Sequence, residues 1–69
     1  MKKEAFDQLP EADRMLVKMT RGEFDVLFAR LKLANQAPDS ATCLAVLDQA
    51  ETSFKALRAF LGRCIKAGL

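Results

Sequence analysis

The chain has 69 residues, a length that suits a single domain spanning residues 1–69. Hydrophobic residues make up 51% of it and charged residues 29%, a balance that excludes a wholly disordered chain. The net charge of +2 argues against a general nucleic-acid binder, and two cysteines without any histidine are too few for a zinc site. Domains of this size bury only about 60% of their unfolded surface, so we expect association with another chain to add stability.

The first nine residues are polar and are predicted to form a frayed N-terminus. The opening Met1-Lys2-Lys3 is followed by Glu4 and Asp7 rather than by an apolar segment, so no signal peptide is predicted. No apolar run approaches the roughly 20 residues of a membrane span. We therefore expect a cytoplasmic protein with reduced cysteines.

A short amphipathic helix is predicted over residues 10–19, with Pro10 in its first turn and Asp7 as a candidate cap. Apolar residues recur along it at helical spacing. They are Ala12, Met15, Leu16 and Met19.

This row of apolar residues loses its phase at residues 20–23. Thr20 and Glu23 have the spacing of a capping box, and Met19 and Phe24 fit a hydrophobic staple around it. We therefore expect the first arm to break near Thr20. The alternative is one long helix that is kinked or rotated at Gly22.

A second helix, predicted over residues 21–35, is apolar on two sides. Val26, Ala29 and Leu33 lie roughly half a turn away from the other apolar face. The N-terminal helix of the same chain could cover this surface, but we favour self-association or docking of a partner, with Arg30 at its rim. The predicted dimerisation or partner-binding residues are Val26, Ala29, Arg30 and Leu33.

Residues 35–40 form the clearest loop, because Pro38 prevents continuation of the helix and Asp39 or Ser40 can cap the next one. The last helix is predicted over residues 40–66, with a core stripe of residues at a spacing of three and four. The stripe consists of Cys43, Leu47, Ala50, Phe54, Leu57, Leu61 and Cys64. No strand is predicted. The sequence thus predicts an all-α helical hairpin with a broken first arm, paired in a homodimeric bundle.

No pattern of residues predicts catalysis. The chain has no histidine, and its acidic pairs, such as Asp48 and Glu51, are typical of a plain helix surface. Cys43 and Cys64 lie about 30 Å apart along one helix, so they cannot bond within it. We expect them to be buried core residues; in an antiparallel pair of chains centred on Phe54, each Cys43 would instead approach Cys64 of the other chain. Neither an enzyme nor a cofactor nor a metal is predicted.

Four basic residues fall within an arc of about 140° on the last helix. They are candidates for secondary contacts with an acidic protein or with phosphate. Alternatively, they complement the helix dipole and keep the chain soluble. They are Lys55, Arg58, Arg63 and Lys66.

Two resemblances bear on these expectations. Residues 20–27, TRGEFDVL, resemble the opening helix of response-regulator winged-helix domains, but no later segment predicts a recognition helix with a β wing. In size and helical character the whole chain resembles the small proteins with which temperate phages inhibit host regulators, such as the quorum-sensing anti-activators of Pseudomonas phages. No individual residue carries this second resemblance. It implies a homodimer of helical hairpins that binds and sequesters a host protein.

These observations predict a non-enzymatic inhibitor or adaptor that masks a regulatory protein such as a transcription factor. The alternative is a helical-hairpin dimer that binds RNA or DNA through the basic face of the last helix. The two differ in their response to salt, because binding through phosphate contacts weakens steeply as salt rises.

Overall fold

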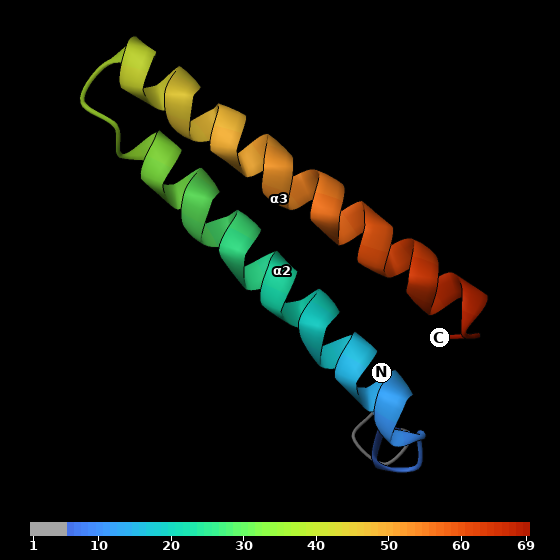
Figure 1. Cartoon of the computed structure of the whole chain (residues 1–69). Helices are drawn as coiled ribbons and strands as arrows, with labels where there is room; N and C mark the ends of the chain where they lie inside the picture. Colours follow the sequence, from blue (N-terminus) through green and yellow to red (C-terminus); the bar gives the residue numbers. More distant parts are fainter. Residues whose placement is uncertain (1–5) are drawn as a thin grey trace.

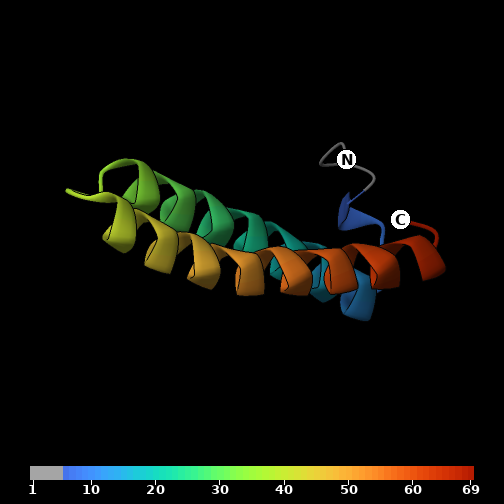
Figure 2. The same ribbon diagram turned by 90° about the horizontal axis from the view of Figure 1, so that it is seen from above.

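The computed structural model describes residues 6–69, and its core is a hairpin of two antiparallel helices (Figure 1). Helix α2 spans Glu11–Asn35 and helix α3 spans Ser40–Lys66. The helices run side by side in two perpendicular views, with the start of α2 and the end of α3 at the same open end (Figures 1 and 2). The molecule measures 47 × 20 × 13 Å, so it is one thin layer. The predicted all-α helical hairpin is confirmed.

The predicted break near Thr20 is wrong, because α2 is one continuous helix through this region. Thr20 does not cap a new helix. Its Oγ1 atom donates a hydrogen bond of 2.8 Å to the carbonyl oxygen of Leu16, one turn earlier in the same helix. Only 6% of Thr20 is exposed, since it packs against α3. Burial between the helices therefore outweighs the local capping pattern, and the two predicted helices at 10–19 and 21–35 are one.

The segment before α2 differs in part from the prediction. Residues 1–5 of the predicted frayed segment lie outside the described residues. Residues 6 and 7 are helical, and the chain then turns at residues 8 and 9, where the Leu9 N–H donates to the Phe6 carbonyl at 3.1 Å. Pro10, not Asp7, stands at the N-cap of α2, and no side chain caps this end.

The N-terminal end of α3 has a side-chain cap. The Asp39 carboxylate accepts a hydrogen bond of 2.7 Å from the Thr42 N–H, which confirms the predicted boundary at Ser40. Hydrogen bonds from Thr42 favour the charged carboxylate and lower the pKa of Asp39 from its ordinary value.

The other end of α3 closes on a glycine. Gly68 has a φ of 78°, which a residue without a Cβ adopts at little cost. The Gly68 N–H donates to the Ile65 carbonyl at 3.1 Å, and the Leu69 N–H donates to the Cys64 carbonyl at 2.9 Å. These two bonds form a Schellman motif, which turns the chain back so that Leu69 is partly buried.

The helices meet along two rows of buried and half-buried residues, which we call the seam. Its residues are spaced alternately three and four apart, as in a coiled coil. Several are small or polar, and no large side chain among residues 6–69 is fully buried. The two-helix core is therefore thin. The seam residues are Leu16, Thr20, Glu23, Leu27, Arg30 and Ala34 of α2, and Cys43, Val46, Ala50, Ser53, Leu57, Phe60 and Cys64 of α3.

Candidate interaction surfaces

One broad side of the hairpin carries large apolar side chains from both helices, and we call it the groove face. Its residues flank the seam at intervals of seven along each helix, with Phe28 added between two of them on α2, so they lie on one side of the layer. Val17 is half-buried, and the others are more exposed, up to 61% in Phe28. The groove face consists of Val17, Phe24, Phe28 and Leu31 of α2 and Leu47, Phe54 and Leu61 of α3.

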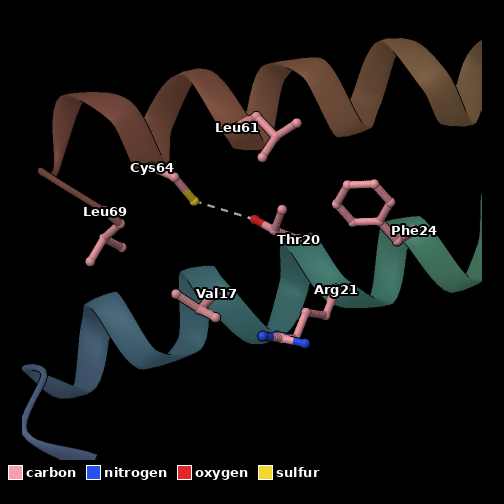
Figure 3. Close-up of a pocket in the computed structure, with 7 residues that line it drawn as sticks. All are labelled: Val17, Thr20, Arg21, Phe24, Leu61, Cys64 and Leu69. Atoms are coloured by element: carbon pink, nitrogen blue, oxygen red, sulfur yellow. Dashed lines mark hydrogen bonds between the residues drawn. The ribbon is translucent and has the colours of Figure 1, made fainter. Parts of the chain in front are cut away.

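Two shallow hollows lie along the groove face. The first, of about 320 Å³, is at the open end of the hairpin, where Cys64 approaches Thr20 (Sγ to Oγ1 3.5 Å) between Phe24 and Leu61 on one side and Leu69 on the other (Figure 3). The second, of about 380 Å³, lies nearer the loop. It is lined by Leu27, Leu31, Leu47, Ala50, Glu51 and Phe54. Both linings are mainly apolar, which suits side chains of a partner better than a charged ligand.

A second apolar surface runs along α2 alone, and we call it the methionine row. It consists of Met15, Met19, Val26 and Leu33, which are between 41% and 59% exposed. Val26 lies about 160° from Phe24 around the helix, so this row is on the opposite side of the layer from the groove face. α2 thus has two exposed apolar sides, as the sequence indicated, and α3 does not cover either completely.

The four residues predicted to bind a partner do not form one patch. Val26 and Leu33 lie together in the methionine row, and Ala29 lies exposed beside them on the outer side of α2. Arg30 instead turns toward α3. One of its guanidinium nitrogens donates to the Gln49 carbonyl at 2.9 Å and also to the Ser53 hydroxyl. Arg30 therefore ties the two helices together.

The four predicted basic contacts are all exposed on α3, but they do not converge on one point. Lys55 pairs with Glu51 at 3.5 Å. The Arg58 guanidinium lies 5.9 Å from the centre of the Phe54 ring, and that of Arg63 lies 5.7 Å from the Phe60 ring. Arg58 and Arg63 lie about 140° apart around α3, so these two arginines diverge. Lys66 makes no ion pair among the described residues.

The cysteines are free thiols, with Cys64 buried in the seam and Cys43 half-buried near the loop. Their packing agrees with the predicted core role. Within residues 6–69, no three cysteine, aspartate or glutamate side chains gather into a cluster that could hold a metal ion. Neither α2 nor α3 has the long apolar stretch that crossing a membrane requires.

The sequence did not reveal which apolar residues of α3 pack in the seam and which lie exposed beside it. It assigned Leu47, Phe54 and Leu61 to the core stripe of the last helix, but they flank the seam and are 39–48% exposed. Two rows from Cys43 to Cys64 alternate strictly between spacings of three and four, one through Leu47, Phe54 and Leu61 and the other, which is the seam, through Val46, Ser53 and Phe60. Spacing alone therefore does not distinguish the seam from the row beside it. The larger apolar residues of the first row favoured it as the core, whereas the helices approach along the row that contains the small residue Ser53.

Comparison with models of protein families, with curated proteins and with solved structures gives no match.

Proposed function

We propose that this chain is a non-enzymatic interaction module that works as a homodimer and masks a surface of another protein, a regulatory protein such as a transcription factor. The observation that carries the proposal is the amount of exposed apolar surface on a two-helix layer. Soluble monomers rarely keep contiguous apolar patches of this kind. Two such surfaces, on opposite sides, give the chain one for its own copy and one for a partner.

The methionine row is the proposed partner-binding surface. Its side chains follow one line along α2 at spacings of four and seven, the arrangement with which an amphipathic helix fills an apolar groove. Methionine side chains are flexible and adapt to irregular surfaces. Beside the row lie Gly22 and Ala29, two small exposed residues that let a partner approach the backbone of α2 closely.

The first prediction tests the methionine row. Val26→Asp and Leu33→Asp each place a charge in the row, so each is expected to abolish capture of a protein partner from host lysate while the variant stays folded and dimeric. Thr52→Asp is the matched control, because Thr52 is exposed on α3, away from the row. Captured proteins are identified by mass spectrometry, and oligomeric state is measured by light scattering. Equal capture by all four proteins would refute the role of the row.

Binding of nucleic acid through the basic residues of α3 is the competing function. It is less favoured because Lys55 is paired with Glu51 and the two arginines diverge. The salt dependence of capture separates the two. Protein capture through apolar contacts is expected to survive physiological salt, whereas nucleic acid held by phosphate contacts is lost steeply between low and physiological salt.

A further inference from the structure

We propose that the occupant of the groove face is a second copy of this chain, which packs face to face so that the two α3 helices run antiparallel across Phe54. The product is a four-helix bundle in which each methionine row stays exposed on an outer side. This inference rests on the homodimer of the proposed function and assigns it a surface, a direction and a register.

The broad side of the layer that carries the groove face is large enough for a stable dimer. The layer is 47 Å long and 20 Å wide, so the outline of each broad side is about 900 Å². A standard specific interface buries roughly 800 Å² on each partner. The methionine row is a single line of side chains on one helix, so it offers a narrower contact. In addition, the thin seam leaves no large side chain fully buried among residues 6–69 of one copy, and a second layer would bury Phe24, Phe28 and Phe54.

The groove face is also arranged symmetrically about its middle, as a two-fold contact requires. On α3, Leu47 and Leu61 lie seven residues on either side of Phe54, or about 10 Å along the axis. Antiparallel pairing about Phe54 therefore brings each Leu47 to the level of Leu61 of the second copy. On α2, Phe24 lies three residues before Leu27 and Leu31 lies four residues after it, and Leu27 lines the same hollow as Phe54. The middle of the groove face on α2 is thus level with its middle on α3.

The charges at the rim complement each other in the same register. Glu51 lies three residues before Phe54 and lines the hollow nearer the loop, and Arg58 lies four residues after Phe54, over its ring. These offsets are about 4.5 and 6 Å along the axis in opposite directions. A two-fold rotation about Phe54 therefore places Glu51 of each copy opposite Arg58 of the other. Within one copy the two residues are seven apart, and Glu51 instead pairs with Lys55.

Chemical crosslinking identifies the face that is used. In a Cys43→Ala, Cys64→Ala background, the reporter Lys55→Cys lies beside the proposed two-fold axis, so a short bis-maleimide is expected to link two copies efficiently. The matched reporter Val26→Cys lies on the outer side of each copy and is expected to remain unlinked. Efficient linking at Val26 without linking at Lys55 would overturn the groove-face dimer but keep the homodimer. A monomer at micromolar concentration, with neither position linked, would overturn both.

Sedimentation equilibrium with the native cysteines tests the register. Phe54→Asp places two like charges at the axis and is expected to weaken dimerisation roughly a hundredfold. Glu51→Arg and Arg58→Glu each break two symmetric pairs and are expected to weaken it about threefold to tenfold. The double variant restores both pairs in reverse and is expected to recover the native dimerisation constant. A double variant as weak as the two single variants combined would overturn the register, whatever the crosslinking shows.

Discussion

Arg30 shows how the environment of one side chain changes its role. Its position beside Val26 and Ala29 indicated a rim residue on a binding surface, because a long cation commonly borders an apolar patch. In the structure it reaches across the seam to Gln49 and Ser53 of α3. Sequence spacing alone could not separate the two roles, since Arg30 also occupies a seam position of α2. The contact depends on Ser53, a small residue in the facing row that leaves room for the guanidinium.

The interhelical role of Arg30 gives a stability prediction. Arg30→Ala removes both hydrogen bonds and the packed stem, and it is expected to lower the free energy of unfolding by about 1–2 kcal/mol. Arg30→Met keeps most of the stem, and Ser53 can turn to bond the Gln49 carbonyl of its own helix, so this variant should lose less. Urea denaturation followed by circular dichroism measures both. An Arg30→Ala protein of native stability that no longer captures its partner would instead show that Arg30 belongs to the binding surface.

The helices themselves differ in how well they could be predicted. α3 begins at Ser40 and ends at Lys66 as expected, because Asp39 and Gly68 are local signals that no distant contact opposes. The prediction for the first arm was wrong at Thr20, where an equally good local signal, the capping box, competes with packing against α3. Thr20 is a seam residue, and a break there would remove its contacts with Leu16 and Cys64. The contact of Thr20 with a residue far along the chain therefore keeps α2 continuous, and no pattern within residues 10–35 indicates that contact.

Continuity of α2 through Gly22 gives the next prediction. Gly22 is exposed inside the helix, and an added Cβ meets nothing within 4 Å. Gly22→Ala is therefore expected to raise the free energy of unfolding by about 1 kcal/mol. Gly68→Ala is the matched control with the opposite sign, because φ of 78° strains any side chain. Thermal unfolding followed by circular dichroism measures both. A Gly22→Ala protein no more stable than the native chain would argue against a continuous helix in solution.

The cap of α3 gives a prediction on pH. Because hydrogen bonds from Thr42 lower the pKa of Asp39 below 3.8, the folded state binds the proton less readily than the unfolded state. The stabilisation from this carboxylate is thus fully present above pH 3.8 and is lost as the pH falls through the lowered pKa. Asp39→Asn keeps a capping side chain without the titration, so its melting temperature should fall less between pH 5 and pH 2 than that of the native chain. An identical fall in both proteins would contradict the assignment.

The whole molecule is a single helical layer whose two sides differ. The sequence indicates two apolar sides on the first arm, and both are present, on opposite sides of the layer. What spacing along one helix could not reveal is that α3 adds Leu47, Phe54 and Leu61 to one side only. That addition depends on how the two helices are rotated toward each other, which small and polar seam residues such as Ala50 and Ser53 determine. The wider side therefore suits a second layer, and the narrower side remains available to another protein.

The hairpin connection also makes the two ends of the seam unequal. Nearer the loop, the contact between Arg30 and Gln49 spans 19 residues, whereas the contact between Thr20 and Cys64 spans 44 residues. Closing a longer stretch costs more chain entropy. The seam contacts between α2 and α3 therefore form first near the loop and open first at the far end. Cys43 and Cys64 lie near these opposite ends of the seam, so the alkylation rate of each thiol reports how often its end of the seam opens. Cys64 is the more buried of the two in the closed hairpin, yet it is the thiol that transient opening of the far end exposes.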